Sequence, residues 1–321
     1  MNGRLSDEAA EVGVVVRDSF AARGGVDLLR RAAEAPDLRA EIAEILDGIG
    51  VWELDPLSDP LEAEVAAAVC RAAGHDVLPY PVAERLAGCG HGAVAPVSQD
   101  PPHLGMHLDL DLGWRGVDLH GRRYRLADAG ELLRTPLAPF GVRARFEPDG
   151  GEDPRGAALL VVLQSWWILG LLEHALADTT EYTGQREQFG RALIRFQAVG
   201  SRLAEMTVAV QSLHELAKYA LWVLAQDAAG VEALVEAVGL RVAALRAADE
   251  VLRGAHQLYG AMGFTDEVDL SWLSRAGQAV RRLPESGHAT HRVLAGMIQA
   301  HGWREFGRPG AAVTTAARAA V

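Results

Sequence analysis

The sequence predicts a mainly α-helical protein with a small β section in the middle of the chain. Helical stretches rich in Ala, Leu, Glu and Arg come first, a Gly- and Pro-rich stretch with period-two alternation follows, and long helical patterns fill the rest. We therefore expect an N-terminal helical domain over residues 1–86 and a reduced middle β domain over 87–153. A C-terminal four-helix bundle over 154–305 and a tail over 306–321 complete the predicted order.

The first section contains three clear helical patterns. They cover residues 25–35, 38–50 and 61–74, and Gly, Pro and Asp residues separate them. Acidic residues occupy the N-terminus where a signal peptide would carry an apolar stretch, so we expect a cytoplasmic protein. Two cysteines, Cys70 and Cys89, leave one disulfide open but exclude a disulfide framework.

The middle section carries the strand signals. Residues 106–114 alternate apolar and polar side chains, which predicts a half-buried strand. Further strands are expected at 116–121, 122–128 and 141–147. The Gly- and Pro-containing segment 147–154 is predicted to be a turn that ends the β section.

The last section predicts an antiparallel bundle. Residues 157–172 are apolar, but this run is shorter than the roughly 20 residues that a membrane span needs, so it predicts a buried helix. Further helices are expected at 230–259, 268–282 and 286–303, and the small-residue end 311–321 is expected to be loosely ordered. One long helix is predicted from an apolar stripe at sevens, Phe189, Phe196, Leu203, Val210 and Ala217, with Leu193, Met206 and Leu213 beside it.

Composition narrows the range of partners. The chain has 321 residues, 49% of them hydrophobic, so it can bury a substantial core. Its 43 acidic and 31 basic side chains give a net charge of −12. Because this charge repels phosphate backbones and anionic lipid headgroups, we expect neither nucleic acid nor a membrane as a partner.

Arg186 and Phe189 are the first candidate ligand-binding residues. They are three residues apart at the predicted start of a long helix, so their side chains would share one face. A guanidinium can donate to phosphate oxygens, and each such charged hydrogen bond is worth roughly 1.5–3 kcal/mol. Taken alone, the pair is better explained by a solvated arginine beside a core phenylalanine, and it is a weak signal.

The surrounding sequence makes the pair specific. A tyrosine, then R-x-x-F-G, then F-Q-x-V and a small L-A-x-M cluster follow one another at Tyr182, Arg186, Phe189, Gly190, Phe196, Gln197, Val199, Leu203, Ala204 and Met206. A second string has Gln257, Gly260, Gly263, Phe264, Asp269 and Arg275, with Ala261 where a second glycine is usual. In order and spacing these strings resemble the acyl-CoA dehydrogenase family. The resemblance covers about residues 155–300 well and the N-terminal helices loosely.

The resemblance implies FAD as the cofactor. In this family the two strings reach across a dimer interface and hold the diphosphate and adenosine part of FAD that the neighbouring subunit mainly binds. Carried over, Arg186 would pair with the diphosphate and Phe189 would pack against the cofactor. Gln257 and Gly260 would hydrogen-bond it, with Ala261 crowding that turn slightly.

The catalytic base of the family has no clear counterpart. The family reaction needs a glutamate that removes a proton alpha to a thioester carbonyl. Its two usual places fall on Pro284 and Leu160, neither of which is acidic. Glu285 lies beside the first place, and is either a base shifted by one residue or an acid placed favourably before a helix. Residues 95–105 keep neither the T-E-P nor the G-S-D string of the flavin-ring loop.

The leading interpretation is therefore one subunit of a heteromeric bacterial acyl-CoA dehydrogenase, in which a homologous partner supplies the glutamate. We expect a heterotetramer acting on an acyl-CoA, with steroid-derived or other bulky thioesters as candidates because unlike-subunit members of the family often take them. Two alternatives remain: a self-sufficient homo-oligomeric dehydrogenase that uses Glu285, and a flavin-free helical scaffold.

Other candidate residues are assigned to structure. The spacing of Cys89, His91, His103 and His107 fits no tetrahedral metal motif, so no metal is expected. His288 and His291 are interpreted as surface or interface residues, and Trp166 and Trp167 as packing residues. The sequence has no G-x-G-x-x-G after a predicted strand and no G-x-S-x-G, so dinucleotide-fold and serine-hydrolase interpretations lack support.

Overall fold

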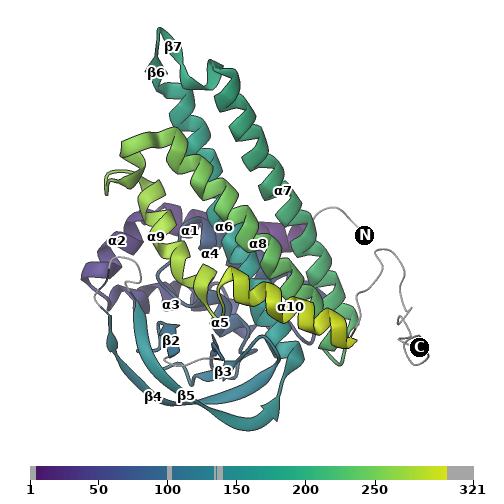
Figure 1. Ribbon diagram of the computed structural model, residues 1–321. Coiled ribbons are helices and arrows are strands. Elements are labelled where there is room, and N and C mark those ends of the chain that lie inside the picture. The colour runs from purple at the N-terminus through teal and green to yellow at the C-terminus, as the bar shows by residue number, and fades with distance from the viewer. Residues whose placement is uncertain (1–4, 100–102, 134, 136–139, 302–321) are drawn as a thin grey trace, which may run out of the picture.

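The computed structural model describes residues 5–99, 103–133, 135 and 140–301. The predicted tail lies outside these residues. N-terminal helices, a small sheet and a long helical bundle follow one another along the chain, and the sheet lies at the lower end of the bundle (Figure 1). This is the predicted mainly α fold with a small β section. The domain boundaries themselves stay a prediction.

The N-terminal section is helical, as predicted. Its elements are α1 (Asp7–Ala21), α2 (Asp27–Glu34), α3 (Leu38–Gly48), the 3-10 helix η1 (Val51–Glu53), α4 (Pro60–His75) and α5 (Val82–Leu86). Local signals set two helix starts: Ser6 accepts a hydrogen bond from the Ala9 amide, and Asp59 accepts one from the Leu61 amide. α4 packs along α6 and gives the N-terminal section its main contact with the bundle.

A five-stranded sheet forms the middle section. Its strands are β1 (Val94–Pro96), β2 (His103–Met106), β3 (Arg115–Val117), β4 (Arg122–Leu132) and β5 (Gly141–Glu152), in the order β1-β3-β4-β5-β2. β1 and β3 are parallel, and the other pairs are antiparallel. The strands predicted at 122–128 and 141–147 are confirmed, and the one at 116–121 survives in part as β3.

The strand predicted at residues 106–114 is wrong. β2 ends at Met106, because His107 takes a positive φ of 60° and its carbonyl accepts from the Leu110 amide in a turn. The alternation of apolar and polar residues has another cause. Leu108 packs in a small hydrophobic cluster on the sheet, whereas Leu110 and Leu112 pack against the larger hydrophobic core that the helices form. Apolar side chains that anchor a turn to two cores therefore imitate the period of a strand.

The turn predicted at residues 147–154 is also wrong for most of its length. β5 continues to Glu152, and Pro148 stands opposite Tyr124 of β4. Along its other edge β5 pairs with β2 only over Gly141–Ala144, so Pro148 lies where β5 has a neighbour on one side alone, and edge positions of this kind tolerate proline. A register shift between Arg122 and Tyr124 accommodates the glycines of this segment.

Long antiparallel helices form the last section, and the predicted bundle helices are found within a few residues of their expected ends. They are α6 (Pro154–Gln185), α7 (Gln197–Gln226), α8 (Val231–Tyr259), α9 (Asp269–Arg282) and α10 (Gly287–His301). α6 is the single helix of the described ranges that is long and apolar enough to cross a membrane, and 94% of that apolar window is buried inside the protein. It is therefore the core helix that residues 157–172 predicted.

The apolar stripe predicted for the long helix is confirmed only from its third member onward. Leu203, Val210 and Ala217 are buried on α7, together with Met206 and Leu213. Phe189 is not on this helix, because the chain first forms a hairpin and the 3-10 helix η2 (Leu193–Arg195), and α7 begins at Gln197. The repeat of seven thus continued by chance through a segment that is not helical.

Candidate functional site

A short hairpin holds Phe189 at the outer end of the bundle. β6 (Glu187–Gln188) pairs with β7 (Arg191–Ala192), and Phe189 and Gly190 form the turn between them with φ of 54° and 76°. Two positive φ values are the mark of a type I′ turn, in which a bulky first residue is strained. The Phe189 side chain is 92% exposed, although its ring approaches the edge of Phe196 at 6.3 Å between centroids. An exposed, strained aromatic indicates a contact with another molecule.

Arg186 lies at the other end of the hairpin. It is the C-cap residue of α6, in extended backbone, and its carbonyl accepts from the Leu193 amide. The expectation that Arg186 and Phe189 share one helix face is wrong, because the helix ends before Phe189. Arg186 is exposed, and no described acidic side chain lies within 4.0 Å of its guanidinium. Its charge is therefore available to an external anion.

Gln257, Gly260 and Ala261 lie where α8 passes into the 3-10 helix η3 (Gly260–Phe264). All three residues are exposed. Gly260 has φ of 62° and ψ of −139°, a backbone conformation that glycine adopts readily and other residues avoid. No atom lies within 4 Å of the place where a Cβ would stand on Gly260, so its surface is open to a close approach.

The structure brings the hairpin after α6 and the end of α8, which carry the two predicted strings, to one end of the bundle (Figure 1). We call this end, with Arg186, Phe189, Gln257, Gly260 and Ala261, the bundle tip. Tyr182 of α6 stacks on Tyr259 of α8 with ring centroids 4.0 Å apart, and Tyr259 donates to Asp178 at 2.7 Å. These contacts hold the last turns of α6 and α8 side by side. The bundle tip also exposes four apolar side chains: Phe189, Ile194, Met262 and Phe264. Exposed apolar side chains beside an arginine without a described acidic partner mark an interaction surface.

The two candidate positions for a base lie elsewhere. Leu160 is 1% exposed inside α6. Glu285 lies in the α9–α10 connection, where its carboxylate accepts hydrogen bonds from the Gln99 amide at 3.0 Å and the Ser98 hydroxyl at 3.3 Å. Glu285 thus joins this connection to the chain just after β1. Its predicted roles, as a base or as an acid before α10, stay predictions.

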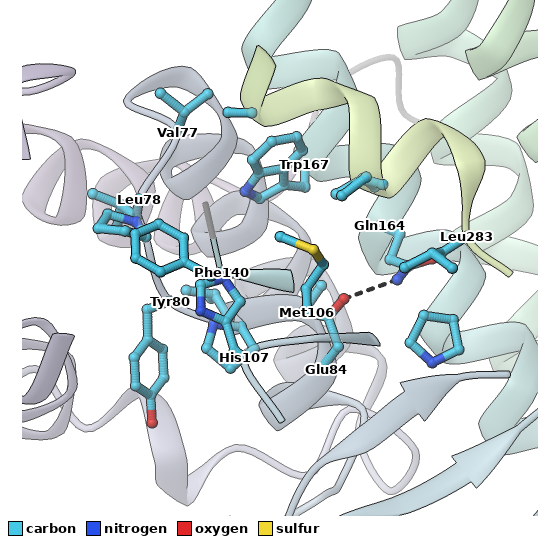
Figure 2. Close-up of a pocket in the computed structure, with 18 of the residues that line it drawn as sticks. Val77, Leu78, Tyr80, Glu84, Met106, His107, Phe140, Gln164, Trp167 and Leu283 are labelled. Atoms are coloured by element: carbon cyan, nitrogen blue, oxygen red, sulfur yellow. Dashed lines mark hydrogen bonds between the residues drawn. The ribbon is translucent and has the colours of Figure 1, made fainter. Parts of the chain in front are cut away.

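A narrow apolar pocket between the N-terminal section, the sheet and the bundle was not anticipated from the sequence (Figure 2). Trp167 and Gln164 of α6 form one wall, and Glu84 of α5 lies among the lining residues. Gln164 donates to the Glu84 carboxyl at 2.8 Å. The local sequence signal was an acidic residue in a short helix whose Val82, Ala83 and Leu86 are all buried.

His107 lies in the wall of the same pocket and is held by buried groups. Its ring stacks on Phe140 at 4.9 Å, and its Nδ1 lies 3.4 Å from the guanidinium of Arg39, which also donates to Asp109. Burial, with the Arg39 charge as a second cause, lowers the pKa of the His107 imidazole to about 3. His107 is therefore neutral in the folded protein around neutral pH.

This gives a prediction for stability against pH. In the unfolded chain His107 takes up a proton near its ordinary pKa of 6.5, whereas in the folded protein its pKa is about 3. Between these two pH values the unfolded state binds more protons than the folded state, so the stability falls as the pH falls. One unit of pH is worth about 1.4 kcal/mol, so we expect a loss of about 2 kcal/mol between pH 6.5 and pH 5 from this group. His107→Asn tolerates the positive φ and should remove that part of the loss in urea unfolding at the two pH values. An unchanged pH dependence would contradict the assignment.

The four residues weighed as a metal cluster are held in different ways. His91 contacts the Cys89 carbonyl at 2.7 Å, His103 accepts from the Phe146 amide at 3.1 Å, and His107 lies beside Arg39. Cys70 and Cys89 are both free thiols, so the disulfide left open by the sequence does not form. Burial raises the pKa of Cys89 to about 12, which keeps it protonated.

A different group, His75, Asp76 and His174, is the candidate ligand cluster of the described residues. The two imidazoles are stacked with centroids 4.3 Å apart and an interplanar angle of 19°. A nitrogen lone pair lies in the plane of its ring, so two nearly parallel rings cannot both point at one ion in this arrangement. The stack braces α4 against α6, since His174 also contacts the His75 carbonyl at 2.5 Å.

The remaining aromatic and histidine assignments agree with the structure. Trp166 is fully buried and meets the edge of His214 at 5.5 Å, which makes it a packing residue. Trp167 is also buried, and it additionally lines the pocket. His288 and His291 are exposed on α10.

Comparison with known proteins agrees with this arrangement. Residues 162–283 match the family described as acyl-CoA dehydrogenase, C-terminal domain. The short-chain specific acyl-CoA dehydrogenase of Clostridium acetobutylicum is 28% identical over 130 residues, which cover 40% of this chain and 34% of that protein. The sequence match therefore spans about a third of this curated relative.

Solved structures extend the likeness to almost the whole chain. The ChsE4-ChsE5 complex from Mycobacterium tuberculosis superposes with a TM-score of 0.71 at 18% identity, over 94% of this chain and 99% of the matched chain. A variant of the Tcur3481-Tcur3483 steroid ACAD gives a TM-score of 0.74 at 17% identity, over 92% and 99%. At these identities the likeness concerns the fold.

The fold and the matched segment together show a likeness to the acyl-CoA dehydrogenase family. Residues 162–283 match the C-terminal domain of that family, and the helix–sheet–bundle order around them is the fold of its solved members. The resemblance predicted from the sequence is confirmed. Members of this family are FAD-dependent flavoproteins.

The bundle tip fits part of this cofactor. The Arg186 guanidinium is free to donate to a diphosphate, Phe189 presents an exposed ring, and the open backbone at Gly260 permits a close approach. These residues point outward rather than into a cavity of their own chain. A cofactor held here would therefore lie between this chain and another.

Proposed function

We propose that this chain is one subunit of an FAD-dependent acyl-CoA dehydrogenase complex, and that its bundle tip completes an FAD site presented by a homologous partner. FAD would accept the hydride when the acyl-CoA thioester is desaturated between its alpha and beta carbons. Arg186 would neutralise the diphosphate, and Phe189 would cover an apolar part of the cofactor. Gln257 would hydrogen-bond the cofactor beside the turn at Gly260 and Ala261.

The observation that carries this proposal is the exposure of Arg186 and Phe189 on one hairpin. Arg186 has no described acidic partner, and Phe189 is an exposed aromatic in a strained turn. No contact within the described residues explains why either side chain is held at the surface. Both are explained if a second subunit covers the bundle tip and brings an anionic, partly aromatic ligand.

A partner is also needed for the proton transfer. Leu160 is apolar and buried, and Glu285 is engaged with Ser98 and with the Gln99 amide. We therefore propose that the glutamate that removes the alpha proton comes from the partner subunit. The likeness to a complex named for two different chains, ChsE4 and ChsE5, supports unlike subunits, and we propose a heterotetramer.

The proposed substrate is a bulky acyl-CoA. The support is the fold likeness to a structure named as a steroid ACAD, which makes steroid-derived thioesters the first compounds to assay. We place the complex in the bacterial cytoplasm, where the free thiols Cys70 and Cys89 would stay reduced.

The test is co-expression with a homologous subunit encoded nearby. We expect a yellow complex that contains FAD, and Arg186→Ala should weaken FAD binding about 10- to 100-fold, because a charged hydrogen bond is worth roughly 1.5–3 kcal/mol. The measurement is the flavin absorbance retained during dialysis. Arg292→Ala is the matched control, since Arg292 is also exposed but lies on α10 away from the bundle tip.

Two outcomes would overturn the proposal. If the isolated chain forms a homodimer that is saturated with FAD and oxidises an acyl-CoA, unlike subunits are not required, and Glu285→Gln kinetics would then test a self-sufficient enzyme. If no assembly shows a flavin spectrum, the chain is a scaffold.

A further inference from the structure

A groove between α8 and α9 gathers basic side chains on an otherwise acidic protein (Figure 1). Arg253 comes from α8, and Arg275 and Arg281 come from α9. The acids that line the groove are Asp249 and Asp266. Three arginines against two aspartates make the groove locally positive, although the whole chain carries a net charge of −12. A positive concave surface of this kind attracts anions.

The two aspartates hold two of the arginines in place but leave part of their capacity unused. Arg275 donates to Asp266 and to the Ser271 carbonyl, the latter at 3.2 Å, and Arg281 donates to Asp249. The side chains of Asp266 and Asp249 are 72% and 60% exposed, and ion pairs with such exposed acids are worth about 1 kcal/mol or less. Because each guanidinium has five N–H donors, both arginines can still donate to a ligand.

Arg253 is the arginine of the groove that lacks an acidic partner. It is exposed on α8, and no acidic side chain of the described ranges lies within 4.0 Å of its guanidinium. Arg275 is held more firmly, since its guanidinium also lies over the Trp272 ring, 4.1 Å from the ring centre. A guanidinium that is already fixed loses little freedom when it binds an anion.

Neutral polar groups complete the groove. Nε2 of His256 lies 2.6 Å from the Ser274 hydroxyl, and the Phe264 ring stacks on the imidazole with centroids 4.7 Å apart. Burial lowers the pKa of His256, so this side chain adds hydrogen-bonding capacity rather than a fourth positive charge. The Ser274 hydroxyl and the Gln278 amide both line the groove and can donate to an oxygen of a bound anion.

We propose that this groove binds a phosphate group, either as inorganic phosphate or as the monoester end of a small phosphorylated molecule. Arg253, Arg275 and Arg281 donate to its oxygens. A phosphate monoester has three strong acceptor oxygens that point in different directions, so guanidinium groups from two helices can bind it at the same time. A carboxylate offers two oxygens in one plane, which a single arginine fork already satisfies.

This inference goes beyond the proposed function and does not rest on it. None of the five residues that define the bundle tip lines the groove. The inference can therefore be tested on the isolated chain without FAD, and its failure would leave the proposal for the bundle tip untouched. In that chain Arg186→Ala should leave phosphate binding unchanged. A loss as large as the loss in Arg253→Gln would mean that phosphate binds at the bundle tip instead, which would overturn the inference.

The measurement is isothermal titration calorimetry of the full chain at low salt, with inorganic phosphate and with glycerol 3-phosphate. Saturable binding of either probe supports the inference, and the tighter of the two shows whether the ligand is free or esterified phosphate. Arg253→Gln keeps a polar side chain and should weaken binding about tenfold, as expected for the loss of one charged hydrogen bond. Arg246→Gln is the matched control, since Arg246 is exposed on α8 but does not line the groove.

Asp249→Asn provides a second test with the opposite sign. It removes the acid that competes for Arg281, so we expect phosphate binding to tighten about threefold. Asp18→Asn changes the net charge equally but lies on α1, and it should leave the affinity unchanged. The inference is wrong if neither probe binds saturably, if Arg253→Gln and Arg246→Gln lose affinity equally, or if the two aspartate variants gain it equally.

Discussion

Replacing Gly170 with alanine is expected to destabilise the protein by about 3 kcal/mol or more, because the added methyl group meets backbone rather than a movable side chain. Gly170 lies where α6 crosses α4. A Cβ on Gly170 would stand 1.9 Å from the Arg71 carbonyl oxygen and 2.9 Å from the His75 amide nitrogen. α4 and α6 would therefore have to move apart along the contact that joins the N-terminal section to the bundle.

At the crossing of α4 and α6, each helix has a glycine packed against the backbone of the other. A Cβ on Gly74 of α4 would stand 1.9 Å from the Trp167 carbonyl oxygen of α6, so Gly74→Ala should cost a similar amount. The measurement is the free energy of unfolding in urea.

Gly184→Ala is the control for this prediction on the same helix. No atom lies within 4 Å of a Cβ at Gly184, so alanine should instead stabilise α6 by about 0.5–1 kcal/mol through its higher helix propensity. Equal effects of Gly170→Ala and Gly184→Ala would show that α4 and α6 do not approach this closely.

Replacing Arg241 with methionine is expected to cost about 3 kcal/mol, because several buried carbonyl groups lose their donor at once. Arg241 is 1% exposed on α8. Its guanidinium donates to the carbonyls of Leu283, Val280 and Glu285, the last two at 3.3 and 3.2 Å. Burial lowers the pKa of Arg241 to about 10, with the Glu285 charge acting in the opposite direction, so the side chain stays charged near neutral pH.

The loss of stability in Arg241→Met should be largest in the α9–α10 connection, which carries Glu285 and its contacts to Ser98 and Gln99. Hydrogen exchange of the amides around residue 285 should therefore speed up together with the fall in unfolding free energy. Arg246→Met is the matched control, since Arg246 is exposed on the same helix and its replacement should change stability by less than about 0.5 kcal/mol. A small effect of Arg241→Met would mean that water or a rearranged loop satisfies the carbonyls.

The bundle helices and the two motif strings could be recognised in the sequence because their signals are local. A buried stripe on α7 repeats with the helical period, α8 is flanked by Gly230 and Gly260, and Pro284 separates α9 from α10. The motif strings have fixed spacing along the chain, so Arg186 and Gln257 were identified without knowing that Tyr182 stacks on Tyr259 and brings the ends of α6 and α8 together.

The errors in the prediction arose where a pattern in neighbouring residues resulted from contacts with residues far away in the chain, or from chance. Leu108 and Leu110 alternate because they anchor a turn to two cores, and Phe189 continued a repeat of seven through a hairpin that interrupts the helix. Neither case can be distinguished from a regular element by period alone.

By itself, the sequence determined the fold class, the order of the sections and the family resemblance, since periodicity and motif spacing are properties of neighbouring residues. The tertiary structure alone decided that Phe189 is held in a strained turn, that Glu84 meets Gln164 in an apolar pocket, and that Glu285 bonds to the chain after β1. The contacts of Glu285 join residues up to 187 positions apart. They depend on how the helices and the sheet pack, which no local pattern records.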